Sequence, residues 1–270
     1  MRTTIRIDKT VAEEVTIARC VYAEVTSVGP VFSSILIFLE KLFKDLYKNL
    51  RGEDYKERFP RLTWQEAMDT YGSDKPDLRF GLPIVDLTSL AKRCSFSVFK
   101  STAVNGGVVR AINVKGGASF TRSEIDSLTD RALGYGAKGM AWIAIRESGE
   151  LYSILTKYFK EEEIEELLNK VKGEPGDFIL FCADKLSTVR RVLGGLRLDI
   201  AKELNLIDNN AFKFAFVTDF PQFEYSEEEG RYVAMHHPFT APMDEDLDKL
   251  ESAPDQVRAK AYDIVLNGNE

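Results

Sequence analysis

Histidine and cysteine are scarce in this chain, which holds two histidines and three cysteines in 270 residues. Cys20, Cys94 and Cys182 lie too far apart in sequence for a CxxC metal site, and they stand in apolar runs. An odd number of such cysteines predicts buried thiols in a reducing compartment instead of a disulfide framework.

Long hydrophobic runs and an excess of positive charge are missing as well. Val28–Leu39 is apolar but much shorter than a membrane span requires. The first fourteen residues carry mixed charge, so no signal peptide is expected. A net charge of −7 argues against binding nucleic acid mainly through a basic surface, although a local patch remains open. We therefore expect a cytoplasmic protein without a membrane segment.

A chain of 270 residues accommodates one large domain or two ordinary ones. Apolar residues recur at helical spacing over 31–50 and predict a helix that ends near Gly52. Thr63-Trp64-Gln65-Glu66 is a capping-box pattern that opens a short second helix. The stretch after that helix, 71–80, reads YGSDKPDLRF and follows neither a strand nor a helix period, which predicts a loop.

Residues 80–210 form a block in which predicted strands and capped helices alternate. Strands are expected at 96–99, 108–114, 140–145 and 178–182, with helices at 121–133, 160–171 and 185–204. The turn Asn105-Gly106-Gly107 favours a hairpin, so we expect an antiparallel or mixed sheet with helices on one side. The Gly-rich Lys115–Ala118 invites a phosphate-binding interpretation, but it lacks the lysine-serine ending of a P-loop.

The last sixty residues return to a strand pattern around the two histidines. Strands are predicted at 212–220, 232–234 and 258–266, with a hairpin tip at 221–224 and an acidic loop at 244–250. Pro238 ends the strand that leads into His236 and His237, so the pair stands where the backbone breaks. An imidazole there either satisfies buried backbone groups or binds a ligand, because it offers a donor and an acceptor together.

Three irregular phrases occur in one order along the chain: FPRLTWQEAM, YGSDKPDLRF and MHHPFT. Together they resemble the bacterial type of aspartyl-tRNA synthetase, a class II enzyme. VVRAINVKGGA and YGAKGMAWI are similar to phrases of the GAD domain that is inserted into the catalytic domain of that family. The resemblance implies an α+β fold in which a partial class II antiparallel catalytic sheet is interrupted by a GAD-type domain. The expected divisions are 1–79 (with 1–30 diverged), 80–210 for the insertion, and 211–270.

The resemblance also implies roles for particular side chains. His236 is expected to contact the substrate L-aspartate, with His237 in a supporting role, and Glu270 matches the glutamate that binds ATP through Mg²⁺. Asp74, Lys75 and Arg79 carry charges suited to steering the acceptor end of tRNA or bracing the rim of the active site. If Arg79 pairs with Asp77 or Asp86 instead, the loop is structural. No catalytic residue is assigned.

The resemblance covers residues 31–270, and both arginine-bearing signature motifs of the family are missing from it. We therefore expect a fragment of a homodimeric enzyme that acts on L-aspartate, ATP and tRNA(Asp), with an incomplete catalytic sheet and no aminoacylation by the isolated chain. Glu24 is a weak match to a family aspartate near the substrate amino group. Two alternatives are a non-catalytic GAD-type module that contacts RNA or supports assembly, and a subunit of a tRNA-dependent amidotransferase.

Overall fold

The computed structural model describes residues 28–270, with side chains described from residue 33 onward. Residues 16–28 alternate loosely in sequence, which predicts a strand. They and the match at Glu24 lie outside the described residues, apart from Val28, which begins a helix. The chain divides into two compact units, Met1–Phe59 and Pro60–Glu270. The finer boundaries predicted at 79/80 and 210/211 remain predictions.

The described part of the first unit contains one long helix, α2 (Val28–Arg51). It confirms the helix predicted over 31–50. Gly52 has a positive φ of 77°, and its amide donates to the carbonyl of Lys48, so the helix ends at the residue type that tolerates this conformation best.

The larger sheet of the second unit has five strands in the order β2-β3-β6-β4-β5, and every neighbouring pair is antiparallel. The strands are β2 (Ile84–Asp86), β3 (Val108–Val114), β4 (Ala141–Ile145), β5 (Leu151–Tyr152) and β6 (Phe178–Asp184). β6 is the central strand, and its first five residues, Phe178 to Cys182, are all buried. An apolar run of this kind indicates a strand that is covered on both faces.

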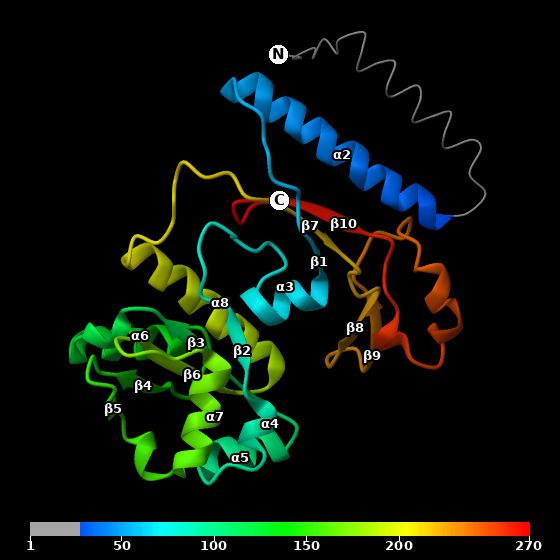
Figure 1. The fold of residues 1–270 in the computed structure, drawn as a ribbon. Helices are drawn as coiled ribbons and strands as arrows, with labels where there is room; N and C mark the ends of the chain where they lie inside the picture. Colours follow the sequence, from blue (N-terminus) through cyan, green and yellow to red (C-terminus); the bar gives the residue numbers. More distant parts are fainter. Residues whose placement is uncertain (1–27) are drawn as a thin grey trace. The chain divides into compact units, whose positions relative to one another are not determined.

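Helices do cover both faces of this sheet (Figure 1), so the expectation of helices on one side is wrong. Helices α6 (Arg122–Gly134) and α8 (Leu186–Glu203) pack with Phe178 and Leu180. On the other face lie α4 (Thr88–Ala91), α5 (Ser97–Val104) and α7 (Glu161–Val171), which pack with Ile179 and Phe181. Short 3₁₀ helices, η1 (Gly117–Ser119) and η2 (Leu155–Lys157), complete this layer structure.

The strand predicted at 96–99 is also wrong, because these residues lead into helix α5. Phe99 and Ala103 are both buried and stand four residues apart, which places them on one face of a helix. A four-residue apolar run does not distinguish a strand from a buried helix by its period. Packing against β3 and β6 therefore decides the conformation of this segment.

The smaller sheet has three strands in the order β1-β7-β10. Its strands are β1 (Arg61–Thr63), β7 (Phe214–Thr218) and β10 (Tyr262–Leu266), with α3 (Trp64–Tyr71) directly after β1. β1 runs parallel to β7, and only β10 is antiparallel, so a purely antiparallel catalytic sheet is not what these strands form. The chain is a mixed α+β protein in which β1 and β10 are the outer strands of this sheet within the described residues.

A separate hairpin, β8 (Phe223–Ser226) and β9 (Arg231–Ala234), follows the small sheet. The hairpin tip predicted at 221–224 is wrong: the turn lies at 227–230, where Gly230 has a positive φ of 64°. The acidic segment after it forms η3 (Asp244–Lys249), followed by η4 (Pro254–Gln256).

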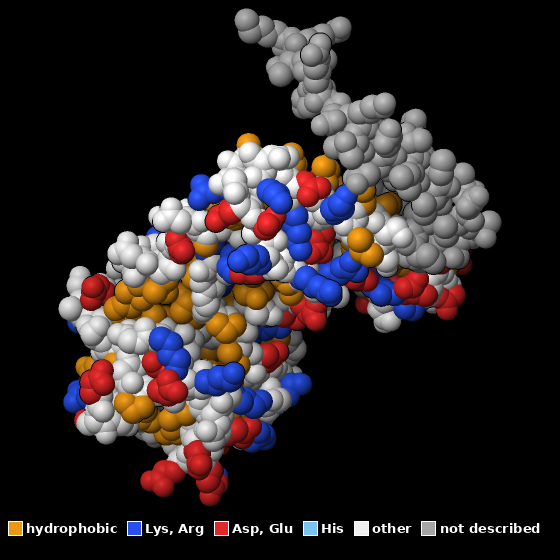
Figure 2. All heavy atoms as spheres, turned by 45° about the horizontal axis from the view of Figure 1, so that its top comes forward, with side chains coloured by type: hydrophobic (Ala, Val, Ile, Leu, Met, Phe, Trp, Pro, Cys, Tyr) orange, Lys and Arg blue, Asp and Glu red, His pale blue; other side chains and the backbone are white. Residues whose placement is uncertain are grey.

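Lysine and arginine side chains are interspersed with acidic ones on the face drawn in Figure 2, and this face shows no broad basic surface. Within residues 28–270, no helix combines the length and the apolar character needed to cross a membrane.

Candidate functional site

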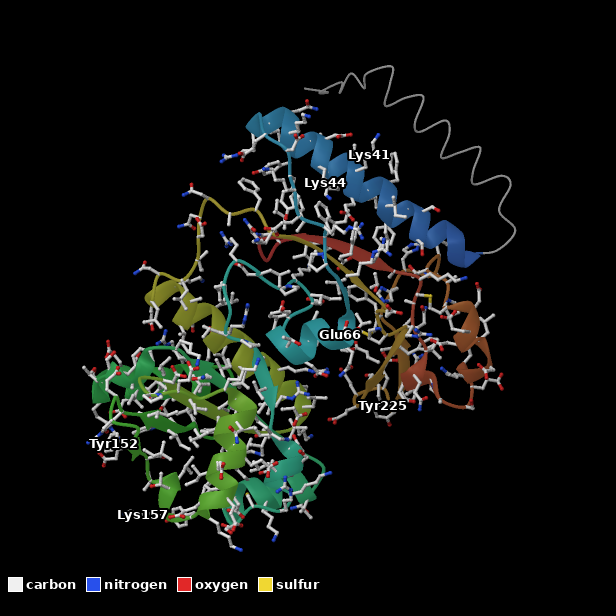
Figure 3. The ribbon with its side chains drawn as sticks, in the orientation of Figure 1. Lys41, Lys44, Glu66, Tyr152, Lys157 and Tyr225 are labelled. Carbon is white, nitrogen blue, oxygen red and sulfur yellow. The ribbon has the colours of Figure 1, made fainter. Side chains whose placement is uncertain are left out.

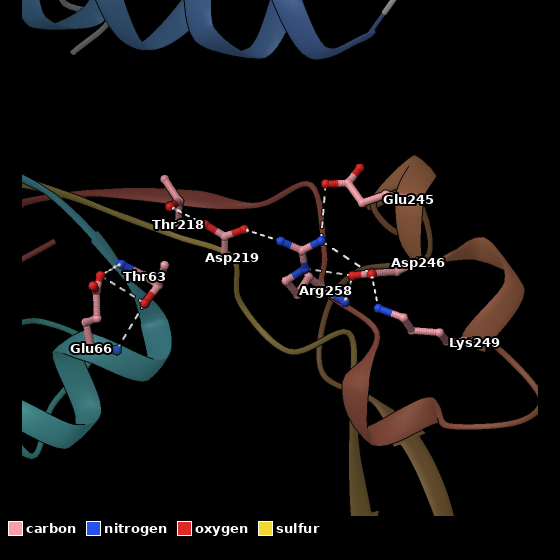
Figure 4. Close-up of polar contacts among 8 residues, drawn as sticks. All are labelled: Thr63, Glu66, Thr218, Asp219, Glu245, Asp246, Lys249 and Arg258. Carbon is pink, nitrogen blue, oxygen red and sulfur yellow. Dashed lines mark hydrogen bonds and ion pairs between the residues drawn. The ribbon is translucent and has the colours of Figure 1, made fainter.

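Helix α3 leads into the charged loop that stands out in the sequence, and Glu66 lies in its first turn (Figure 3). Thr63 accepts a hydrogen bond from the Glu66 amide, and the Glu66 carboxylate accepts one from the Thr63 amide, which confirms the predicted capping box (Figure 4). Gly72 ends the helix with a positive φ of 70°. The start of the irregular segment that follows, residues 72–83, is therefore set by the end of α3.

Within this loop, Arg79 pairs with Asp77. The Arg79 Nη2 lies 2.7 Å from Asp77 Oδ2, and its Nε and backbone amide both lie 3.0 Å from Oδ1. Burial tends to raise the pKa of Asp77, but the hydrogen bonds from Arg79 outweigh it and the pKa is lowered. This pairing is the alternative in which Arg79 has a structural role in the loop.

A second arginine, Arg197 of α8, holds the same loop from outside, and sequence reasoning missed it. Its side chain is 1% exposed and donates to the main-chain carbonyls of Asp77, Phe80, Gly81 and Leu82, at 2.8 to 3.2 Å. Burial lowers the pKa of Arg197 to about 10. The signal in the sequence is its spacing, because residue 197 falls in phase with the inward-facing Leu193 and Ile200.

The chain reverses at Asn267-Gly268, directly after β10. Both residues have positive φ, 53° and 82°, and Leu266 and Asn269 exchange backbone hydrogen bonds across the turn. Asn-Gly is the pair that two-residue hairpin turns favour. The turn carries Glu270 back beside β10, where its carboxylate forms an ion pair with Lys75 of the charged loop.

Asp263 of β10 is the centre of the charges gathered here, and it was not identified from the sequence. Burial and the nearby carboxylates of Glu270 and Asp74 raise its pKa, whereas Lys75 and His236 act in the opposite direction. All four groups therefore lie near enough to Asp263 to act on its charge. The signal was a single carboxylate inside an otherwise apolar strand, Tyr262–Leu266.

Lys75 and Glu270 form an ion pair, and both of them, with Asp74 and His236, act on the charge of Asp263. Arg79 of the same loop is engaged with Asp77. Two carboxylates from β10 and its return and one from the loop form an acidic group with one lysine and one imidazole. Among residues 28–270, no three histidine, cysteine or acidic side chains are arranged to hold a metal ion by themselves.

The two histidines differ in exposure and in their contacts. His236 is half-buried, its Nε2 lies 3.1 Å from the carbonyl oxygen of Pro221, and its ring meets Phe220 edge-on. His237 is exposed, and its Nδ1 accepts a hydrogen bond from the Phe239 amide. A carbonyl only accepts, so the Nε2 of His236 carries the proton and its Nδ1 remains for a ligand.

The Gly-rich Lys115–Ala118 does not form a phosphate cradle. Asp177, which is 3% exposed, accepts from Lys115 Nζ at 2.9 Å and from the Gly116 amide at 3.4 Å. The Ala118 amide donates to the Gly176 carbonyl. A carboxylate already stands where an anion would bind, and it would repel a phosphate.

Comparison with known proteins finds a match to the GAD domain family over residues 99–193. The chain is 52% identical over 231 residues to the aspartate–tRNA(Asp/Asn) ligase of Lachnoclostridium phytofermentans and, over the same length, 52% identical to the aspartate–tRNA ligase of Agathobacter rectalis. It is 50% identical over 237 residues to the aspartate–tRNA(Asp/Asn) ligase of Anoxybacillus flavithermus. These matches cover 86% or 87% of this chain and confirm the resemblance found in the sequence.

The chain spans about two fifths of the length of these relatives, 39% or 40%. The similarity therefore concerns a segment of each relative that contains the GAD domain and the residues on both sides of it.

Proposed function

We infer that this chain, which is homologous to a segment of bacterial aspartate–tRNA ligases, carries part of the site at which L-aspartate is activated with ATP for transfer to tRNA(Asp). The observation that supports this most is the gathering of His236, Lys75 and Glu270 around Asp263, from three segments that are far apart in sequence. The similarity to aspartate–tRNA ligases covers 231 residues and so extends well beyond the GAD match at 99–193.

His236 is proposed to bind the side-chain carboxylate of L-aspartate through Nδ1. Because Nε2 is directed at the Pro221 carbonyl, a neutral ring offers only an acceptor at Nδ1. A carboxylate needs a donor, so L-aspartate is expected to bind the imidazolium form of the ring. The ion pair that results also discriminates against the uncharged amide of asparagine.

Glu270 and Asp263 are proposed to hold Mg²⁺ together with the phosphates of ATP. Carboxylate oxygens are hard ligands of the type that Mg²⁺ takes, usually one or two from the protein with the remainder from phosphate and water. Asp263 and Glu270 supply two carboxylates of this kind, and Glu270 lies near enough to Asp263 to act on its charge. The ion would neutralise charge on the phosphates when bound.

Lys75 and Asp74 are proposed to lie at the rim, where the acceptor end of tRNA approaches. The Lys75 side chain is 42% exposed and pairs with Glu270. A lysine in this position can exchange its carboxylate partner for a phosphate, because its ammonium group is a compact cation on a flexible stem. The full-length parent is proposed to be a homodimer in the cytoplasm.

Calorimetric titration of the 270-residue chain with Mg·ATP, and then with L-aspartate, tests the proposal. Glu270→Gln and Asp263→Asn are expected to weaken Mg·ATP binding about tenfold each, the scale of one lost charge-assisted contact. His236→Gln should leave the affinity for Mg·ATP unchanged and lower the affinity for L-aspartate. Glu162→Gln, on the exposed part of α7 in the five-stranded layer, is the matched control. Wild-type affinity for Mg·ATP in both carboxylate variants would refute the assignment.

A further inference from the structure

We propose that Arg197 is a positioning residue for the nucleotide site: helix α8 uses its guanidinium to set the loop that presents Lys75 to Glu270. The expected effect on Mg·ATP binding rests on the proposed function, whereas the effect on the position of Lys75 does not. It adds a role for a residue that belongs to the block around the GAD match and lies outside the group of charges at Asp263.

Among the described residues, no carboxylate forms an ion pair with the guanidinium of Arg197. Its hydrogen bonds go to four main-chain carbonyls between residues 77 and 82, and the rings of Tyr71 and Phe80 lie 4.8 and 4.1 Å from its central carbon. Arginine donates through a planar fork and stacks on aromatic rings, so this pocket suits arginine and not lysine. The contacts specify the path of the backbone and not merely the presence of a charge.

Close backbone packing brings α8 to the loop. A Cβ on Gly194 would stand 2.7 Å from the carbonyl oxygen of Gly72, at the C-cap of α3, which is nearer than any real Cβ approaches. The absence of side chains at these two glycines allows the helix and the start of the loop to touch. Arg197 follows one turn later on α8 and reaches the other end of the same loop.

The loop fixed in this way contacts the residues of the site at two points. Asp77, whose carbonyl accepts from Arg197, packs against Gly268 of the β10 turn, where an added Cβ would lie 3.3 Å from the Asp77 Cβ. Lys75, two residues earlier, forms the ion pair with Glu270. Displacement of the 77–82 backbone would therefore separate Lys75 from Glu270 and loosen the turn that carries Glu270.

The environment of Lys75 gives a readout that a purely structural arginine would not change. The Lys75 ammonium group forms an ion pair with Glu270, so an acylating reagent must compete with that carboxylate for the amine. A brief pulse of an amine-acylating reagent, read by mass spectrometry, gives the rate at Lys75 relative to Lys157 on η2. Arg197→Lys and Arg197→Met are compared with Arg191→Met, a neighbour on α8 whose Nε donates to the Tyr135 carbonyl.

Both Arg197 variants are expected to raise the relative acylation rate of Lys75 about tenfold, because the released amine loses its carboxylate partner. Mg·ATP affinity should fall by a similar factor, and Arg191→Met should change neither quantity. A folded Arg197→Lys protein with wild-type reactivity at Lys75 would overturn the proposal. If neither variant folds, the acylation of Lys75 in wild-type protein is measured at increasing urea concentration, together with hydrogen exchange of the α8 amides. The proposal requires Lys75 acylation to rise as the α8 amides open. A rise that precedes their opening refutes the proposal.

These outcomes separate the inference from the proposed function. Wild-type protein that fails to bind Mg·ATP contradicts the proposed function, whereas the response of Lys75 to Arg197 still tests the positioning. Binding of Mg·ATP that depends on Glu270 but not on Arg197 supports the proposed function and contradicts the positioning role.

Discussion

Asp246 offers the most direct test of how the segment near His236 is held. Its side chain is fully buried, at 0% exposed, and accepts from Arg258 Nε at 2.7 Å and from Lys249 Nζ at 2.6 Å (Figure 4). Arg258 in turn contacts Asp219 and forms a backbone bridge with Pro221, whose carbonyl faces His236. We predict that Asp246→Asn destabilises the small-sheet region.

The size of the effect follows from the exposure of the partners. Removing one member of a buried ion pair costs about 3–5 kcal/mol when the other charge is left buried. Here the side chains of Arg258 and Lys249 are 39% and 37% exposed, and Arg258 keeps Asp219 and Glu245 as acceptors. We therefore expect a loss of about 2–3 kcal/mol in the free energy of unfolding, close to the value of a few hydrogen bonds to charged groups.

Urea unfolding followed by Trp64 fluorescence measures this loss, in a Trp142→Phe background, because the chain has only two tryptophans and Trp64 lies on α3 beside the small sheet. Glu245→Gln is the control: this acceptor of Arg258 is 64% exposed, and exposed pairs contribute about 0–1 kcal/mol. A change below about 0.5 kcal/mol for Asp246→Asn, with an unchanged m-value, would refute the reasoning.

The same pair predicts a pH dependence. Hydrogen bonds from Arg258, which outweigh the opposing effect of burial, lower the pKa of Asp246 far below its ordinary value. A carboxyl group with a lowered folded pKa contributes stability above its unfolded pKa, about 3.9, and loses it as the pH falls toward the folded pKa. The difference between wild type and Asp246→Asn should stay constant above about pH 5 and shrink below about pH 4. A difference that instead grows in acid would contradict the assignment.

Three further predictions concern other parts of the chain. Asp69→Asn removes the carboxylate that pairs with both Arg110 and Arg190, which are 5% and 7% exposed. The free energy of unfolding, measured with urea, should fall by about 3 kcal/mol. Gly268→Ala places a side chain at a φ of 82° and should cost about 1 kcal/mol while weakening Mg·ATP binding in a titration. Burial raises the pKa of Cys182 to about 12, so iodoacetamide at about pH 8 should label it only after unfolding.

Local signals predicted the helices well and the edges of the strands less well. The capping box predicted at Thr63 forms, and a second one begins the helix predicted from residue 121, because the hydrogen bonds of a cap join residues three positions apart. The prediction at 96–99 failed because the conformation of this segment depends on packing against strands that come later in the chain. The predicted hairpin tip failed because Gly230, and not Pro221, supplies the conformation that the turn needs.

The candidate site was predicted in part, from its irregular phrases. His236 and Glu270 were named from the resemblance, and Asp74 and Lys75 from their charges. Lys75 pairs with Glu270, all four groups act on the charge of Asp263, and their roles remain predictions. Asp263 and Arg197 were not named, although each breaks an apolar pattern: a carboxylate within a strand, and a cation on the inward side of a helix. Arg197 meets Asp77 across 120 positions of sequence, and no local pattern specifies a partner at that distance.

The contacts that hold the charged loop show what the five-stranded layer contributes to the small-sheet region. The backbone leaves the small sheet after α3 and returns to it at β7, so the five-stranded layer could in principle be a separate attachment. Its residues nevertheless hold the junction: Arg110 of β3 and Arg190 of α8 share Asp69, and Arg197 holds the backbone from Asp77 onward. Deleting the block would leave Asp69 without these two cations and the loop without its anchor. Residues of both layers therefore hold the charged loop, and its geometry depends on α8 as well as on the turn that follows β10.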